Sequence, residues 1–193
     1  MARRIDESKI ERIREAALHI ISEQGILNCS VAMIAQEAQV SVGYLYRHYP
    51  SKDNLIEFLL KNSMELINQR VESLLASNVD LDGMIRGVVG LIAEAAKDQP
   101  SKIKFFIIVF NDFSYSLNAA LQDQIRDLTH LVIERYKKSG ELKQSTAPID
   151  LFLSLISIPF QYYALHYKSA FEADNTIEEL EERIVRMVKA SLS

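Results

Sequence analysis

The sequence predicts an all-α protein in which three short helices precede a larger helical domain, about nine helices in all. Glycine (6) and proline (4) are scarce among the 193 residues. Because all-β proteins need a turn roughly every 8 to 12 residues, this composition favours a few long helices. Apolar residues also recur at spacings of three and four along most of the chain, which is the period of an amphipathic helix.

The overall composition indicates a globular protein with a real core and argues against several other classes. Hydrophobic residues make up 48% of the chain and charged residues 25%. Cys29 is the single cysteine, so we expect no intramolecular disulfide and no CxxC metal site. The N-terminus lacks an apolar signal segment, and the apolar stretch 151–160 is too short to span a membrane. These features predict a cytoplasmic protein without a membrane segment.

The charge balance gives nucleic-acid binding no support. The formal net charge is −4, the pI is about 5.6, and the first 60 residues are not basic either. Any binding to DNA must therefore depend on a local arrangement of side chains.

Local signals divide the first part of the chain. Residues 6–23 have the pattern of an amphipathic helix, which Gly25 is expected to end. Ser30 and Ser41 are the expected N-caps of two short helices, at 30–37 and 42–48.

Pro50 ends the third helix, because it lacks an N–H and disfavours helix at the residue before it. Ser51 then caps a helix from Lys52 to about Ala76. Further helices are expected at roughly 84–97, 101–112, 115–138, 149–171 and 176–192.

The second and third helices, with the turn between them, have the spacing of a helix-turn-helix pair. Val42, Leu45 and Tyr49 recur at i, i+3 and i+7, so we expect them to pack against the first two helices. The side chains left to face away are those of Gly43, Tyr44, Tyr46, Arg47 and His48. In such a pair the second helix enters the major groove of DNA.

Each residue type on this helix suits contact with DNA. Gly43 allows the backbone to approach the groove floor, and the Tyr44 ring suits the methyl group of thymine. Tyr46 and His48 are expected to donate to phosphates, as is Lys52 at the start of the next helix. The candidate DNA-binding residues are Ser30, Ser41, Val42, Gly43, Tyr44, Tyr46, Arg47, His48 and Lys52. Arg3 and Arg4 are expected to add a mobile basic arm.

The stretch CSVAMIAQEAQVSVGYLYRHYPSKDNL (29–55) resembles the DNA-binding region of the TetR family of bacterial transcriptional regulators. The resemblance is close over about residues 8–60. It implies a homodimer with a three-helix DNA-binding domain and a larger C-terminal domain that holds a small-molecule pocket and the dimer interface. It places Val42, Gly43 and Tyr44 at bases, and Tyr46, His48, Lys52 and the region of Ser30 at phosphates.

Two positions depart from the family pattern. Gln39 stands where the family usually has glycine in the turn, and a positive φ there costs a non-glycine residue on the order of 1 kcal/mol. Met33 stands where the family often has a polar residue. The recognition helix carries a single arginine and no asparagine or glutamine, so we expect DNA shape to contribute to specificity.

The helix at 149–171 carries apolar residues on two adjacent tracks, so it must be buried on two sides. Pro159 interrupts it, and a kink there is equally well read as a pocket wall or as simple packing. Aromatic residues at 102–117 are more readily explained as core than as a ligand site. If an effector pocket for an apolar or aromatic molecule exists, its candidate residues are Phe106, Phe110, Asn111, Phe113, Tyr115, Tyr162, Tyr163 and His166.

The last helix has an apolar stripe, Ile177, Leu180, Ile184 and Met187, and a polar face with the expected pair Glu182–Arg186. By the resemblance, this helix and 149–171 would form a homodimer interface, which places two DNA-binding domains on a palindrome. The expected domains are 1–52 for DNA binding, with the helix-turn-helix at about 30–49, and 53–193 for effector binding and dimerisation.

The sequence thus predicts a regulator that binds double-stranded DNA, most readily a repressor released from its operator by a small-molecule effector. No paired carboxylates, nucleophile motif, phosphate loop or metal-spaced cluster is apparent, so we expect no enzymatic activity, cofactor or metal. Two alternatives remain open: an all-α carrier or enzyme without a DNA role, and a TetR-like protein that activates transcription or binds a protein partner.

Overall fold

The structure is a computed structural model that describes residues 6–170 and 176–193. Over those residues the chain is helical and contains no strand, which confirms the predicted all-α fold. Two compact units make up the chain: Met1–Asn62 with Lys104–Ser116, and Ser63–Ile103 with Leu117–Ser193. We call them the N-terminal unit and the large unit. The predicted functional division after residue 52 stays a prediction, and the proposed arm at Arg3 and Arg4 lies outside the described residues.

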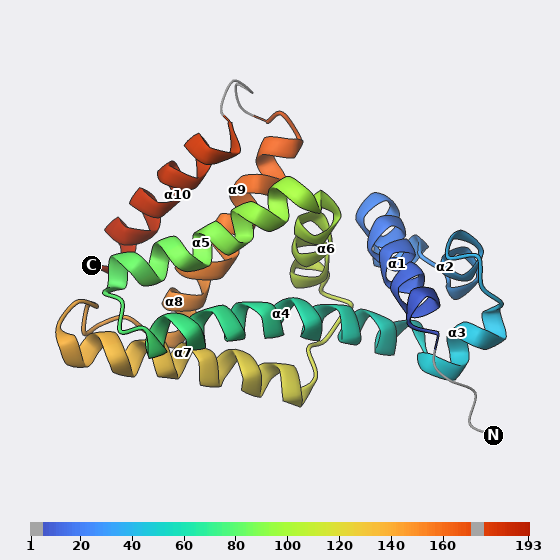
Figure 1. Cartoon of the computed structure of the whole chain (residues 1–193), viewed down its shortest axis with the longest axis horizontal. Helices are drawn as coiled ribbons and strands as arrows, with labels where there is room; N and C mark the ends of the chain where they lie inside the picture. Colours follow the sequence, from blue (N-terminus) through green and yellow to red (C-terminus); the bar gives the residue numbers. More distant parts are fainter. Residues whose placement is uncertain (1–5, 171–175) are drawn as a thin grey trace. The chain divides into compact units, whose positions relative to one another are not determined.

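The N-terminal unit contains three helices that form one cluster in Figure 1, α1 (Glu7–Asn28), α2 (Val31–Glu37) and α3 (Val42–His48). It also contains the beginning of α4 (Lys52–Ala76) and the end of α6 (Pro100–Asn111). The bounds of α3 and α4 are those that the capping residues predict. In α1, Gly25 has φ 79° and interrupts the helix, which then continues for one further turn to Asn28.

The core of the N-terminal unit forms around the buried faces of these helices. Its fully buried side chains include Ile13, Ile21, Ile34, Leu45, Leu55 and Ile56. At its edge, the Arg14 guanidinium lies 4.7 Å from the centre of the Phe58 ring, and Tyr49 meets the same ring edge-on at 5.4 Å. These contacts join α1, the end of α3 and α4.

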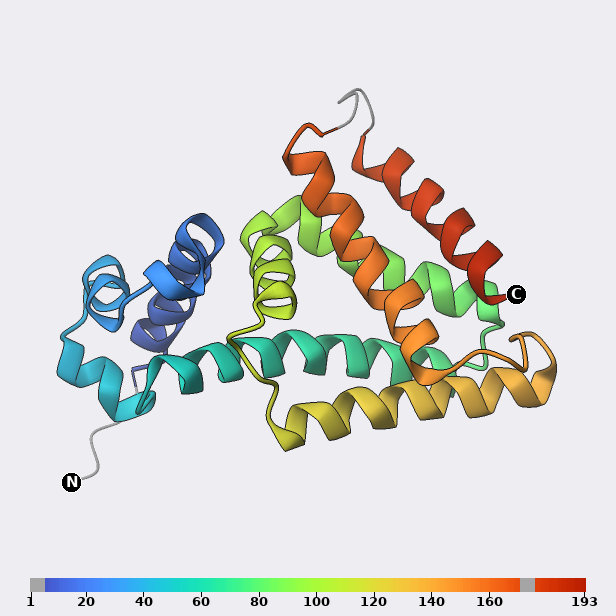
Figure 2. The same cartoon turned by 180° about the vertical axis from the view of Figure 1, so that it is seen from behind.

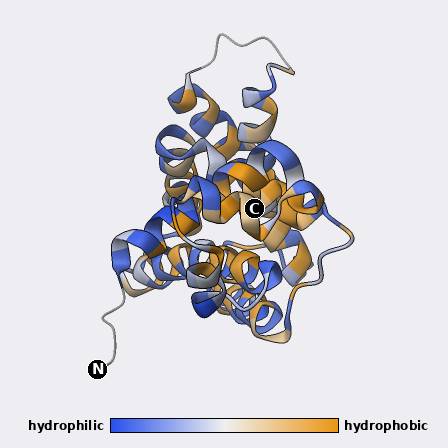
Figure 3. Ribbon diagram, turned by 90° about the vertical axis from the view of Figure 1, so that its right-hand side faces the viewer, coloured by the Kyte–Doolittle hydropathy of each residue, from blue (hydrophilic) through white to orange (hydrophobic). Residues whose placement is uncertain are grey.

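The large unit contains the rest of α4 together with α5 (Leu81–Asp98), α7 (Ala119–Ser139) and α10 (Ile177–Leu192). It also contains a continuous helical run made of α8 (Pro148–Phe152), the π-helical η1 (Leu153–Ser157) and α9 (Ile158–Tyr167). α5, α9 and α10 lie side by side in both views (Figures 1 and 2). Hydrophobic and hydrophilic residues alternate along the ribbons of individual helices, as amphipathic packing requires (Figure 3).

Pro159 has the effect that its position predicts, although through a π-helical segment. Proline has no N–H to offer the carbonyl of the residue four positions earlier. Just before it, the N–H of Ile158 bonds the carbonyl of Leu153, five residues back, so the backbone widens into η1.

The helical run Pro148–Tyr167 is, by length and composition alone, long and apolar enough to cross a membrane, with a mean hydropathy of 1.2. Half of it (50%) is buried inside the protein, however, and it packs against α5 and α10. It is therefore well explained as a core helix, as the two apolar tracks of the sequence indicate.

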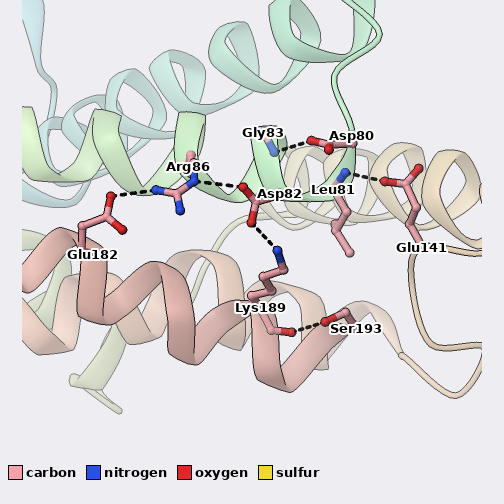
Figure 4. Close-up of polar contacts among 9 residues, drawn as sticks. All are labelled: Asp80, Leu81, Asp82, Gly83, Arg86, Glu141, Glu182, Lys189 and Ser193. Atoms are coloured by element: carbon pink, nitrogen blue, oxygen red, sulfur yellow. Dashed lines mark hydrogen bonds and ion pairs between the residues drawn. The ribbon is translucent and has the colours of Figure 1, made fainter.

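α10 packs its apolar stripe within the chain. Its buried residues are Leu180, Ile184, Val185, Val188 and Leu192, whereas Ile177 and Met187 of the predicted stripe are only half-buried. Two of its charged residues bond α5 (Figure 4): Glu182 bonds Arg86 at 2.7 Å, and Lys189 bonds Asp82 at 2.7 Å. Within α5, Arg86 also bonds Asp82 at 2.9 Å. Glu182, which was expected to pair with Arg186 on its own helix, thus pairs with Arg86 across the helices.

Candidate nucleic-acid interface

Two serines hold the helix-turn-helix pair in place. The Ser30 hydroxyl oxygen accepts a hydrogen bond from the Met33 N–H at 3.2 Å, and Ser41 accepts from the Tyr44 N–H at 3.1 Å. Each serine satisfies an N–H that the helix itself leaves unpaired. Between the helices, Gln39 has φ 54°, so the turn does require the left-handed conformation that the family normally gives to glycine.

α3 is anchored by two residues. Leu45 is fully buried and Tyr49 is 6% exposed, as their spacing predicts. Val42, which the same spacing placed inward, is 41% exposed. It is the first residue of α3 and lies one turn before Leu45, beyond the part of the helix that packs against the core. That expectation of burial is wrong, whereas the exposed position agrees with the base contact that the resemblance implies.

The outer face of α3 is free of contacts within the described part of the chain. Tyr46 is 48% exposed and Arg47 is exposed, and neither side chain makes a hydrogen bond or ion pair there. Gly43 is exposed too, and a Cβ at this position would meet nothing within 4 Å. Packing within the chain therefore does not require glycine at 43, although glycine costs a helix roughly 1 kcal/mol relative to alanine.

Tyr44 and His48 differ from this free face. Their rings lie 4.8 Å apart, and the Lys9 ammonium lies 5.5 Å from the centre of the Tyr44 ring. The Tyr44 hydroxyl is buried without a hydrogen-bond partner among the described residues, and the contact of Tyr44 with a base stays a prediction. No sequence pattern indicated Lys9, because its neighbour Tyr44 lies on another helix.

Lys52, a predicted phosphate contact, bonds carbonyl groups of its own chain. Its ammonium donates to the carbonyl oxygen of Ile26 at 2.7 Å and to that of Cys29 at 3.0 Å, and the contacts are part-buried. The sequence suggested a phosphate contact, but two of the three ammonium hydrogens are directed into the protein. Its charge also slightly offsets the burial that raises the pKa of the Cys29 thiol.

The predicted effector residues fall in both units. Phe106 is buried and its ring stacks on Phe110 at 4.3 Å, while the Asn111 amide donates to the carbonyl of Ile107 on its own helix at 2.7 Å. Phe113, another candidate effector residue, is fully exposed (103%). α6 ends at Asn111, so Phe113 lies beyond the helix that carries Phe106 and Phe110.

Tyr115 is half-buried, and burial, followed by the charges of Glu57 and Asp53, raises its pKa to about 12. In the large unit, Tyr162 and His166 are half-buried, while Tyr163 is fully buried with a hydroxyl that has no partner among the described residues. Burial, and then the charge of Glu181, raises the pKa of Tyr163. An orphan buried hydroxyl is costly, and it marks a place where a polar ligand atom or a water is expected.

The large unit contains a cavity at a different place. It is apolar, has a volume of about 10 Å³, and is lined by Val71, Leu128, Thr129, Val132, Leu151, Phe152, Leu155 and Ile156. This volume is about that of one water molecule, far below the roughly 300 Å³ or more of ligand pockets. None of the predicted effector residues lines it.

Known proteins resemble this chain in its N-terminal sequence. Residues 13–59 match the family described as "Bacterial regulatory proteins, tetR family". The HTH-type transcriptional regulator HbdR of Aromatoleum sp. (strain CIB) is 34% identical over 65 residues, which are 34% of this chain and 28% of HbdR. The nucleoid occlusion factor SlmA of Vibrio vulnificus (strain YJ016) is 30% identical over 119 residues, 61% of this chain and 59% of SlmA. The chain thus covers less than two thirds of either relative.

Solved structures resemble the chain over nearly its whole length. A TetR family transcription regulator from Marinobacter aquaeolei VT8 superposes with a TM-score of 0.78 at 17% identity, over 97% of this chain and 96% of that one. FadR of Bacillus subtilis, in complex with stearoyl-CoA, superposes with a TM-score of 0.68 at 17% identity, over 95% of this chain and 100% of FadR. At such identities the likeness concerns the fold. Residues 13–59 thus match the TetR family of bacterial regulatory proteins, and the chain as a whole shares the fold of TetR-family regulators.

Proposed function

We infer that the protein is a DNA-binding transcriptional regulator that acts in the cytoplasm as a repressor and has no catalytic role. The outer face of α3 is the observation that carries this inference. Gly43, Tyr46 and Arg47 are exposed and without partners in the described chain, on a helix whose inner side Leu45 holds firmly. A well-anchored helix with an unpaired aromatic and cationic face suits a partner outside the protein.

The geometry suits the major groove of DNA. With no side chain at Gly43, the start of α3 can approach the base edges closely. Val42 is exposed beside it and offers an apolar contact for a thymine methyl group. Tyr46 and Arg47 are free to donate to phosphates, which set the register of the helix on the duplex.

A palindromic operator requires two copies of the chain. On the predicted interface helices, Ile149 is 60% exposed and Leu153 is 46% exposed, and they lie one turn apart on the same run. Large apolar side chains in such positions are suited to a symmetric contact with a second copy. Leu153→Glu is expected to shift the protein from dimer to monomer in analytical ultracentrifugation, and an unchanged dimer would remove this face from the proposal.

Release from DNA by a small apolar or aromatic effector is the second part of the proposal. The large unit holds the orphan hydroxyl of Tyr163, and the described cavity of about 10 Å³ is too small for an effector. An effector that binds at this cavity would have to enlarge it, selecting a conformation with a different affinity for DNA. FadR, whose structure contains stearoyl-CoA, is a neighbour in fold, which makes acyl compounds reasonable first probes.

The test is fluorescence anisotropy with duplexes from upstream of the protein's own gene, measured over a series of salt concentrations. Specific binding is expected to weaken steeply with salt, because each phosphate contact releases counterions. Arg47→Ala is expected to weaken it by roughly tenfold or more.

Lys138→Ala is the matched control, because Lys138 is an exposed cation on α7 of the large unit. It removes the same charge and is expected to leave affinity nearly unchanged. If neither promoter DNA nor a selection from random duplexes gives sequence-specific binding, the proposal fails and a carrier becomes the better reading.

The similarity to SlmA favours a second candidate, a nucleoid occlusion factor, because that alignment extends well past the helix-turn-helix region. A genome-wide map of bound sites separates the two. A regulator is expected at a few promoters, whereas nucleoid occlusion needs sites spread over much of the chromosome.

A further inference from the structure

The ammonium group of Lys52 joins the beginning of α4 to the end of α1. It donates to Ile26 O at 2.7 Å and Cys29 O at 3.0 Å, across 26 and 23 positions of sequence. α1 ends at Asn28, so the last carbonyls lack the N–H groups that a continuing helix would supply, although the Ile26 carbonyl also accepts from the Cys29 N–H at 3.3 Å. Lys52 supplies a charged donor to them.

The bonded carbonyls belong to the segment that leads into the helix-turn-helix pair. Cys29 directly precedes Ser30, whose side chain caps α2 through the Met33 N–H. The bond to the Cys29 carbonyl therefore holds the peptide group directly before α2. A short connecting turn then leads from α2 to α3. The Cys29 side chain itself is 2% exposed, so this segment is held from both sides.

The Lys52 ammonium is part-buried against its own chain. Besides the two carbonyls, its charge contributes to a lowered pKa of Asp112, which is set chiefly by hydrogen bonds from Ser114. A lysine that serves mainly as a phosphate ligand is expected to extend into solvent, as Arg47 does. Moving the ammonium to a phosphate would remove two part-buried hydrogen bonds, and it would leave the Ile26 carbonyl with the Cys29 N–H alone, which is unfavourable.

We propose that Lys52 is a positioning residue for DNA recognition, which acts by fixing the α1–α2 connection rather than by neutralising a phosphate. This inference rests on the proposed function, because it concerns how the same surface recognises DNA. It makes two separable predictions. Lys52 contributes to the order of residues 26–33 in the free protein, and it contributes to affinity without contributing to the salt dependence of binding.

Three variants test it. Lys52→Met keeps the aliphatic stem and removes the charge and the donors, while Lys52→Arg keeps both. Lys61→Met is the control, since Lys61 is an exposed lysine on the same helix. The measurements are the melting temperature, hydrogen exchange of peptides covering 26–33, and operator affinity over a salt series below the lowest melting temperature.

For Lys52→Met we expect a melting temperature about 5 °C lower, faster exchange at 26–33 and an affinity roughly tenfold weaker. The slope of log K against log [salt] should stay that of the parent protein. Lys52→Arg should recover part of each loss, and Lys61→Met should change none of the three.

Two results would overturn the proposal. An unchanged melting temperature with a slope smaller by about 0.9 per subunit would make Lys52 a phosphate ligand. A lowered melting temperature with unchanged affinity would make its role structural only. Failure of the parent protein itself to bind any specific duplex would refute the proposed function instead, while the exchange data would still report on the α1–α2 connection.

Discussion

α3 and α10 are both amphipathic helices anchored by buried aliphatic residues, but their polar faces are used differently. On α10, Glu182 and Lys189 meet Arg86 and Asp82 of α5 at 2.7 Å each (Figure 4). On α3, Arg47 has no such partner in the described chain. The charges of Glu182 and Lys189 on α10 are therefore paired within the protein, whereas the charge of Arg47 on α3 is available to a partner outside it.

This difference separates a structural surface from a recognition surface better than composition does. The chain is acidic overall, with a net charge of −4, and nothing in its bulk charge favours DNA. A cation next to α3 in sequence can also be used within the protein: the Lys52 ammonium bonds two carbonyl groups of its own chain. Arg47 differs from Lys52 in that its guanidinium has no partner among the described residues, and it differs from other exposed cations in its place on the outer face of α3.

Leu45→Ala should have the largest effect, because it removes the inner anchor of α3. Leu45 is fully buried, and truncating such a leucine costs roughly 3 kcal/mol of unfolding free energy. Urea denaturation followed by circular dichroism measures the loss. Val42→Ala on the same helix should cost less than about 0.5 kcal/mol, since Val42 is 41% exposed. Equal losses for the two would show that the inner and outer faces of α3 are not distinct.

Gly43→Ala should separate stability from function. A Cβ at this helical position meets nothing within 4 Å, so the variant is expected to be more stable by roughly 0.5–1 kcal/mol. DNA affinity should fall, because the methyl group holds the helix away from the groove floor. Thermal unfolding and anisotropy on the same preparations measure both. A variant that gains stability and keeps full affinity would contradict the close approach of α3 to DNA.

Asp82→Asn examines the paired face. Hydrogen bonds from Lys189 and then Arg86 lower the pKa of Asp82 in the folded protein. A carboxylate whose pKa is lower when folded stabilises the fold above its unfolded pKa of about 3.9, and this stabilisation disappears as the pH falls through the folded value. The variant should therefore be less stable than the parent at pH 7, by less than about 1 kcal/mol since these pairs are exposed, and should approach it in acid.

Urea titrations at pH 7 and in acid measure this difference, and 1 M salt should reduce it at pH 7. A difference that persists unchanged at low pH would show that the α5–α10 pairs are not its source. Glu179→Gln is a suitable comparison, because it acts on the cap of α10 at Thr176 rather than on the pairing with α5.

Gln39→Gly should have the smallest effect. Gln39 has φ 54°, a conformation that is unfavourable for a residue with a side chain. Relief of this strain is partly offset by the greater freedom of glycine in the unfolded chain, so we expect a gain of about 0.5 kcal/mol. The thermal midpoint measures it. A loss of stability would mean that the Gln39 side chain contributes to the turn more than its strain costs.

Local sequence signals were enough to predict the helices of the helix-turn-helix region, because these signals act over a few residues. Ser30 and Ser41 bond N–H groups three positions ahead, at 3.2 and 3.1 Å, and the helix bounds follow from them. The positive φ of Gln39 agrees with the glycine that the family resemblance implies at this position. Apolar periodicity correctly identified Leu45 and Tyr49 as buried.

The packing of separate helices sets which polar side chains face inward and which are free, and the sequence patterns did not predict this. The Lys52 ammonium lies 26 positions in sequence from one of its acceptors, and Glu182 bonds Arg86 across 96 positions. The end of α6 at Asn111, which leaves Phe113 exposed, likewise decided against one predicted pocket residue. Caps and periodicity are properties of neighbouring residues, whereas these contacts depend on how separate helices pack, and no local pattern encodes that.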